Sequence, residues 1–348
     1  MTVEPFGGKG GYVLRRWVGR VLCLLLVLGT ACAAAEVEIV MTFGGDAVLG
    51  TREEWKGNAD NFDACIEANG FQWPFALVAD IFKEDDLTLV NLENVLQANK
   101  KGLVKDKQYR FRGDPSYTEI LTVSGIESVN IANNHYIDYS ASGRESTRKA
   151  LADGGIAFSG YEFLYVFEKD GYKIGFGGCR ETVYRQKKAV IKEDIRKLRE
   201  MGCDVVVYSC HWGKEYSPTH NSLQKKMAQY VIDCGADIII GTHPHCVQGI
   251  ESVKNVPVVY SLGNLMFGGT HDMRTFDAFM VRAHFRFGEN GYEGVELKPI
   301  PVLTSSAAPE NNFQTMVAEG EDHARIMKLI QKDSKMKITE SMWFPAKK

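Results

Sequence analysis

Imidazole, amide and carboxylate side chains follow several apolar runs of this chain, and they are the residues best suited to chemistry. Five such runs end in candidate metal ligands, which are Asp46, Glu93, Asn134, His211, His243 and His245. Ligands of open α/β sheets bind outside the carboxyl ends of the strands. Mixed nitrogen and oxygen donors suit divalent ions such as zinc, manganese or iron. The pattern therefore predicts a centre of one or two divalent metal ions.

The most specific local signal is His243-Pro244-His245. Two imidazoles stiffened by the proline between them could bind one metal ion or divide between two, although the same triplet can occur by chance in a loop. The carboxylate of Asp46 follows two glycines and could bind metal or stabilise a turn. Glu93 shares a strand face with Asn91, but a carboxylate at a strand end can also be solvated. His211, at another strand end, could equally be a structural histidine.

A second group of polar residues combines His135 with Asp138, three positions later. His135 could act as a general acid or as a donor to an anion, and Asp138 could fix its tautomer by accepting the other ring proton. Both are therefore candidate catalytic residues. The alternative is that these polar residues cap the helix that follows.

The elements that must position these residues alternate between strands and helices. Strands are expected over 37–43, 87–92, 128–132, 174–178, 204–208 and 237–240, and helices over 75–82, 140–153, 189–201 and 223–234. This alternation predicts helices packed on a sheet, an α/β fold. Later strand-like runs at 256–262, 276–287 and 292–300 have no helices between them, and Asn290-Gly291 is a hairpin signal. They predict a second, more antiparallel sheet.

The chain divides into a leader, a domain and a tail. Residues 1–35 combine basic residues, an apolar run and small residues, which is the pattern of a signal peptide or membrane anchor. Cleavage, lipid attachment at Cys32 and retention all stay open, but each predicts an exported, extracytoplasmic protein, secreted or membrane-anchored. Residues 37–305 are expected to form one domain. Residues 306–348 form a polar C-terminal segment with a helix over 321–332.

Charge and cysteine content narrow the class of protein. A net charge of -3 gives no electrostatic footprint for nucleic acid. The cysteines form no Cys-x-x-Cys pair, so a zinc ribbon is not expected. Cys203 and Cys234 each precede a strand and could pair in an exported protein, or they could be buried free thiols.

The order of the motifs resembles the CapA family of bacterial capsule, or poly-γ-glutamate, biosynthesis proteins, within the calcineurin-like metallophosphatase superfamily. The resemblance runs from about Ile39 to Phe267 and rests on Gly45-Asp46, Asn91-Leu92-Glu93, Asn133-Asn134-His135 with Asp138, His211-Trp212-Gly213 with Glu215, His243-Pro244-His245 and Tyr260-Ser261-Leu262-Gly263-Asn264. It implies a two-sheet αββα sandwich, in which two sheets are flanked by helices.

The resemblance also implies roles for the candidate residues. Asp46 would bind a first metal, Glu93 would stand in the bridging position, Asn134 and His211 would bind a second metal, and His243 and His245 would be divided between the two. His135 would face the substrate as an acid or charge stabiliser. Substrate contacts are expected from Asn91, Asn133, Trp212, Glu215 and Asn264. The chain departs from the superfamily at Val48, where classical members carry a histidine, so the number of metals stays open.

Two functions follow from these residues. The first is a metal-dependent hydrolase of capsule or poly-γ-glutamate biosynthesis or export that acts on a phosphoester or a γ-glutamyl amide; a secreted phosphatase without a link to capsule is a variant of it. The alternative is a non-catalytic assembly factor of the cell envelope that binds an anionic polymer within a biosynthesis complex at the membrane. Arg110, Arg112 and Lys214 could supply cationic contacts to such a polymer, or each could be a solvated surface residue.

Overall fold

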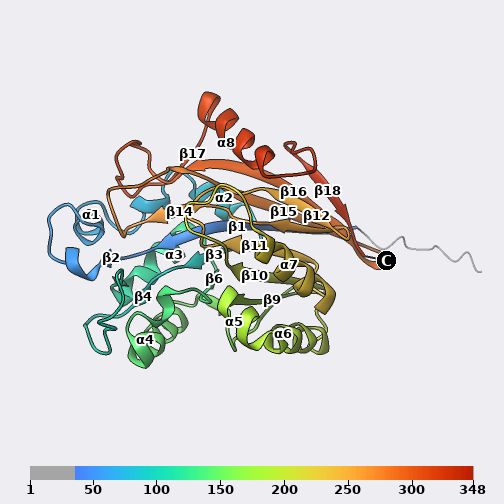
Figure 1. The fold of residues 1–348 in the computed structure, drawn as a ribbon, viewed down its shortest axis with the longest axis horizontal. Helices are drawn as coiled ribbons and strands as arrows, with labels where there is room; N and C mark the ends of the chain where they lie inside the picture. Colours follow the sequence, from blue (N-terminus) through green and yellow to red (C-terminus); the bar gives the residue numbers. More distant parts are fainter. Residues whose placement is uncertain (1–35, 348) are drawn as a thin grey trace, which may run out of the picture. The chain divides into compact units, whose positions relative to one another are not determined.

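The computed structural model describes residues 36–347, so the predicted leader lies outside the described residues. Two mixed sheets carry the fold (Figure 1). The first runs in the order β17 (Met316–Val317), β16 (Gly291–Leu303), β15 (Asp277–Gly288), β1 (Val37–Val48), β3 (Leu87–Leu92), β6 (Ser128–Asn130) and β7 (Ala157–Ser159), with β14 (Asn264–Phe267) paired to β1 and β18 (Met342–Pro345) paired to β16. The second runs β12 (Ile250–Val253), β13 (Val256–Val259), β11 (Ile238–Thr242), β10 (Val205–His211), β9 (Tyr172–Arg180) and β8 (Tyr165–Lys169).

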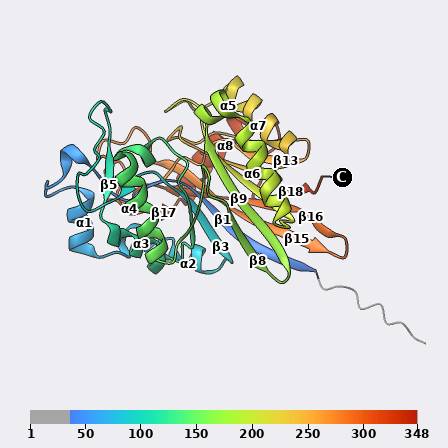
Figure 2. The same cartoon turned by 90° about the horizontal axis from the view of Figure 1, so that it is seen from below.

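Helices cover the outer faces of both sheets. Four pack against the first sheet: α1 (Phe62–Asn69), α2 (Ala79–Lys83), α3 (Thr118–Ser124) and α4 (Ser140–Asp153). Two helices, α6 (Ala189–Glu200) and α7 (Ser222–Cys234), pack against the second sheet, beside α5 (Glu181–Lys187). Figure 2 shows α3 and α4 on one side of the strands and α5 to α7 on the other. The predicted αββα sandwich is therefore confirmed.

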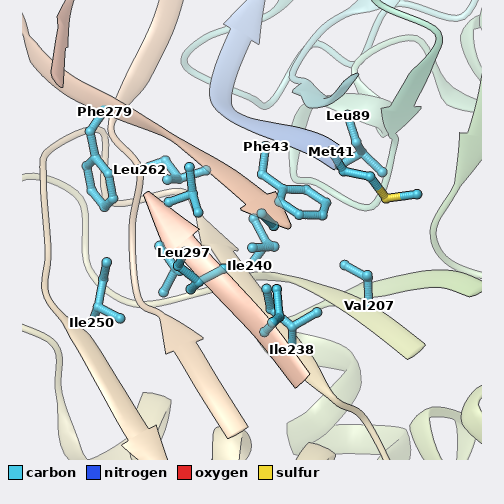
Figure 3. Packing of buried hydrophobic residues seen from close by; sticks show 14 of the residues in the cluster. Met41, Phe43, Leu89, Val207, Ile238, Ile240, Ile250, Leu262, Phe279 and Leu297 are labelled. Carbon is cyan, nitrogen blue, oxygen red and sulfur yellow. The ribbon is translucent and has the colours of Figure 1, made fainter. Parts of the chain in front are cut away.

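The strands read as continuous apolar runs because both of their faces are covered. In β10, Val205 and Val207 point into the core between the sheets, whereas Val206 and Tyr208 point toward α6 and α7. In β11, Ile238 and Ile240 face inward in the same way (Figure 3). Because side chains alternate along a strand, every second residue after these inward pairs also faces the space between the sheets.

The smaller elements complete the edges. A third sheet contains three short strands in the order β2 (Thr51–Arg52), β5 (Phe111–Gly113) and β4 (Val95–Leu96). The C-terminal helix α8 (Gly320–Lys332) lies opposite α6 in Figure 1 and buries Ile326 and Ile330 in the core between the sheets. No helix within residues 36–347 has both the length and the apolar character needed to cross a membrane.

Several expected elements differ from the structure. The strand expected over 37–43 continues to Val48, so Asp46 lies within β1 rather than after it. The helix expected over 75–82 is reduced to α2, because a 3-10 turn at Trp73–Phe75 precedes it. The strand expected over 128–132 ends at Asn130.

The prediction of a separate antiparallel sheet was wrong. The β15–β16 hairpin pairs antiparallel with β1 and so extends the first sheet, while β12 and β13 join the second. Sequence pattern identifies a hairpin but not the edge that it joins, because the edge is chosen by long-range packing. The six cysteines within the described residues are all free, so Cys203 and Cys234 do not pair.

Candidate metal centre

The candidate ligands lie at the strand ends, where polar side chains replace the apolar residues of the inner sheet faces. His211 continues the inward series of Val205 and Val207 along β10, and Glu93 continues the series of Leu87 and Leu89 along β3. The carboxyl ends of these parallel strands meet at one end of the sandwich. The strand alternation therefore directs both side chains into the gap between the sheets.

Asp46 reaches the same gap through an irregularity in β1. The pairing of β1 with β3 shifts register between Phe43 and Asp46, so Asp46 faces inward and Ala47 faces the outer helices. Such a bulge reverses the alternation of a strand. Gly45 permits the close passage of the chain here, because a Cβ at this position would lie 2.0 Å from the carbonyl oxygen of Gly263.

Glu93 is the carboxylate on which the centre converges. Its side chain is completely buried, and neither Oε1 nor Oε2 has a hydrogen-bond partner. Two groups of metal-competent atoms share it: Glu93 with His243 and His245, and Glu93 with Asp46 and His211, each within 4.8 Å. A buried carboxylate that accepts no hydrogen bond is costly unless a cation compensates its charge. Its surroundings therefore fit a divalent cation.

The histidines surround this carboxylate. His211 Nε2 lies 3.4 Å from Glu93 Oε1 and 2.6 Å from Asn134 Oδ1. His245 Nδ1 lies 3.3 Å from Asp46 Oδ2 and 3.9 Å from Glu93 Oε2. His243 Nδ1 is buried without a partner, like the Glu93 oxygens. Orphaned acceptors and imidazole nitrogens around one point are the donor set that a transition metal requires.

The His243-Pro244-His245 loop holds its two rings in an unusual backbone conformation. The φ angles of His243 and His245 are 97° and 55°, in the region that favours glycine. Residues held there cost about 1–3 kcal/mol each and cluster at functional sites. The backbone N–H of His243 donates to Asp46 Oδ2 at 3.1 Å, which ties the loop to β1.

The charges of the group shift the pKa values of its members strongly. Burial and the neighbouring Asp46 carboxylate raise the pKa of Glu93 well above its usual range. Burial lowers the pKa of His245, but the carboxylates of Glu93 and Asp46 outweigh it and raise that pKa to about 10. Burial and the neighbouring His245 lower the pKa of His243 to about 4, and burial lowers that of His211 well below its usual range. His243 and His211 are therefore neutral and available as ligands near pH 7.

His135 and Asp138 form a pair beside the candidate ligands. His135 Nδ1 lies 2.8 Å from Asp138 Oδ2, so the carboxylate holds the Nδ1–H tautomer and leaves Nε2 free. Burial lowers the pKa of His135 to about 4, against the raising effect of Asp138. Lys107 also bonds Asp138 and donates to the carbonyl of Asn134 at 2.7 Å. His135 is thus a neutral, oriented imidazole.

Of the residues predicted to contact substrate, three asparagines orient the candidate ligands by hydrogen bonds. Asn133 links the strand ends, because its Oδ1 accepts from the backbone N–H of His135 and its Nδ2 donates to Asn91 Oδ1. Asn91 donates to Asp46 Oδ1 at 2.7 Å, and Asn264 Oδ1 lies 2.9 Å from His245 Nδ1. These amides orient the candidate ligands rather than opening toward a substrate.

Trp212 and Glu215 occupy different surroundings. Trp212 is completely buried in the core under α7, where its Nε1 donates to the carbonyl of Tyr260 at 2.8 Å, and it does not line the cavity. Glu215 is exposed and lines a cavity of about 850 Å³ that His135, His243 and His245 also line. The candidate centre therefore opens to solvent through a cavity large enough for a substituent of considerable size.

Two cationic side chains near the candidate centre, Arg180 and Lys107, were not predicted from the sequence. Arg180 ends β9 in register with His211, and its charge contributes to the lowered pKa values of His211 and His243. The expected strand over 174–178 stopped two residues short of it, so extending that strand would have found it. Lys107 lies in a loop 28 positions before His135, and no local pattern marks it.

Two of the cationic contacts expected from the sequence are already used within the protein. Arg112 is buried and pairs with Glu53 at 3.0 Å, so its prediction as a polymer contact was wrong. Arg110 pairs with Glu54. Lys214 is exposed and lines the cavity.

A sandwich of two sheets with imidazoles and carboxylates at its strand ends is the arrangement expected of the calcineurin-like metallophosphatase superfamily. Residues 40–269 match the family described as bacterial capsule synthesis protein PGA_cap, and the chain belongs to this family.

Relatives with established names agree with the family. The PGA biosynthesis protein CapA of Bacillus subtilis is 29% identical over 290 residues, covering 77% of this chain and 73% of the relative. The capsule biosynthesis protein CapA of Bacillus anthracis is 26% identical over 324 residues, covering 85% and 74%. A polyglutamine synthesis accessory protein of Mycobacterium tuberculosis, named as probable, is 21% identical over 285 residues, covering 66% and 74%.

Proposed function

We propose that this protein is a metal-dependent hydrolase of capsule or poly-γ-glutamate biosynthesis or export, acting on a γ-glutamyl amide or a phosphoester. The observation that carries the proposal is the completely buried Glu93 carboxylate, which has no hydrogen-bond partner and is shared by two groups of metal-competent side chains. The relatives support the biological setting, because their names place them in capsule and PGA biosynthesis. That setting also supports an exported protein of the cell envelope.

The donor set fits one or two divalent ions of manganese, zinc or iron. Glu93 would stand between the two groups, with His243 and His245 on one side and Asp46 and His211 on the other. Asn134 would add its amide oxygen beside His211. A divalent ion bound there would supply Lewis acidity to polarise the scissile group and acidify a water molecule.

The residues around the ions would position the substrate and accept a proton or a hydrogen bond from it. His135 faces the cavity as a neutral imidazole whose Nδ1 proton is held by Asp138, so its Nε2 can accept a proton or a hydrogen bond from the reacting groups. Lys107 and Arg180 place positive charge near the same end of the sandwich. They would stabilise negative charge that develops on the substrate.

The test is a substrate screen with the purified full-length protein. Defined γ-linked glutamate oligomers and simple phosphoesters are incubated with the protein after loading with manganese, zinc or iron, and released amines or phosphate are measured. The proposal predicts release that EDTA abolishes and that Lys347→Gln, a change far from the centre in sequence and packing, leaves intact. No release from any substrate with any metal would contradict it.

A second candidate function is the non-catalytic binding of an anionic polymer during envelope assembly. Exposed and half-buried cations on the cavity wall, Arg52, Lys214 and Arg274, favour this alternative. Binding of polymer that persists without metal, together with no hydrolysis, would support it over the first proposal.

A further inference from the structure

Two arginines line the same cavity as the metal centre and have no carboxylate partner within residues 36–347. They are Arg52, at the end of β2, and Arg274, in the loop before β15. The Nε of Arg52 is buried without any hydrogen-bond partner. Glu53 is the next residue in the chain, yet it pairs with Arg112 and Lys100 instead. Both guanidinium groups are therefore left for an outside anion.

Aromatic rings hold both groups in place. The guanidinium of Arg52 lies 3.7 Å from the centroid of the Trp55 ring and 5.4 Å from that of Tyr109. The guanidinium of Arg274 lies 4.4 Å from the centroid of the Tyr216 ring. Stacking fixes the plane of a guanidinium and leaves the N–H groups at its edge free, in the geometry that binds a carboxylate through two hydrogen bonds.

The cavity favours an extended ligand with separated charges. Its volume of about 850 Å³ exceeds what a single small anion would fill. Glu215 and Asp272 line it together with the cations, so the wall is not uniformly positive. A ligand with anionic groups spaced by polar, uncharged links is compatible with such a mixed wall. A dense polyanion such as polyphosphate would meet repulsion from both carboxylates.

We propose that Arg52 and Arg274 form a carboxylate subsite that binds two pendant carboxylates of one amide-linked acidic chain, and that this chain crosses the cavity beside the metal centre. The inference deepens the proposed function and rests on it in one respect, because the bound chain would be the one that the hydrolase cleaves. Binding by the arginines needs no metal, so it can be tested separately from hydrolysis.

The experiment measures binding of fluorescent γ-linked glutamate oligomers to the full-length protein by anisotropy, with EDTA present. The variants are Arg52→Gln, Arg274→Gln and the double variant. Arg52→Lys keeps the positive charge but removes the planar guanidinium that stacks on the Trp55 ring. Arg196→Gln is the control, since Arg196 is exposed on α6 and pairs with Glu193 and Glu200. Metal content and thermal unfolding are recorded for each variant to establish that it folds.

The subsite predicts a loss of affinity of about tenfold for each single variant and about a hundredfold for the double variant, with Arg196→Gln unchanged. Arg52→Lys should recover only part of the loss. Equal affinity of the double variant and the wild type would overturn the subsite, even if the protein hydrolyses its substrate. Equally tight binding of polyphosphate would overturn the assignment to carboxylates. Arginine-dependent binding without hydrolysis would support the subsite and sink the hydrolase proposal.

Discussion

Replacing Glu93 with glutamine should stabilise the metal-free protein and remove most of the stabilisation that a bound metal provides. Glu93→Gln keeps the shape of the side chain and removes a charge that is completely buried and has no hydrogen-bond partner. Because Glu93 belongs to both groups of metal-competent side chains, the variant loses a donor to either ion position. The metal-free protein should gain about 1–3 kcal/mol, since a buried charge beside Asp46 is removed.

The metal-dependent part of this prediction follows from binding linkage. An ion at a hundred times its Kd stabilises the native state by about 2.7 kcal/mol. If Glu93→Gln weakens binding about a hundredfold, the same ion concentration stabilises the variant by only about 0.4 kcal/mol. The raised pKa of Glu93 determines how the stability difference between variant and wild type changes with pH. Its folded pKa lies above its unfolded pKa, so the gain of the metal-free variant is absent below the unfolded pKa and grows as pH rises.

The assay is denaturant unfolding of wild type and variant in EDTA and in excess manganese or zinc. Glu215→Gln serves as the control, because Glu215 is an exposed carboxylate of the same cavity outside both groups of metal-competent side chains. A variant that is less stable than wild type in EDTA, yet keeps the full metal-dependent gain, would refute the reasoning. So would a loss of that gain in Glu215→Gln.

Three further predictions concern other parts of the protein. His135→Asn should lower turnover by about 10²- to 10⁴-fold with metal content unchanged, and elemental analysis beside kinetics checks it; loss of metal would place His135 among the ligands instead. Burial raises the pKa of Asp194 to about 6, so wild type loses stability as pH rises from its unfolded pKa near 4 through 6. Asp194→Asn, which keeps an acceptor for the Tyr208 hydroxyl at 2.9 Å, should be about 2 kcal/mol more stable at pH 7.5 and no more stable at pH 4 by denaturant unfolding; a pH-independent difference would contradict this. Asp333→Ala removes the acceptor of the His220 ring, which is buried, and should cost about 3 kcal/mol in unfolding free energy; a cost below about 1 kcal/mol would show that α8 is held by its apolar contacts alone.

Much of the fold could be predicted because the residue pattern of each strand indicates whether its faces are buried. The runs at β10 and β11 are apolar on both faces, and that pattern occurs where helices cover a sheet. The helix expected over 140–153 matches α4 in both bounds. The pairing of β15 with β1 could not be predicted, because nothing local to either strand states which sheet edge will accept the hairpin.

The candidate site divides in the same way. Residues at the end of a strand or directly after it, such as His211 and Glu93, could be found because strand alternation fixes the direction of their side chains. Arg52 and Lys107 could not, because they reach the site from a short edge strand and a loop. Their position depends on tertiary packing that leaves no periodic signal in the sequence.

The central claim is a metal centre shared by the two sheets, and elemental analysis of the purified protein tests it most directly. The measurement compares wild type with a His243→Ala/His245→Ala variant after reconstitution with manganese, zinc or iron. The account predicts about one to two equivalents of metal in the wild type and a near-complete loss in the variant, with the fold retained by circular dichroism. Wild-type protein that retains no metal after reconstitution, or a variant that retains as much as wild type, would contradict it.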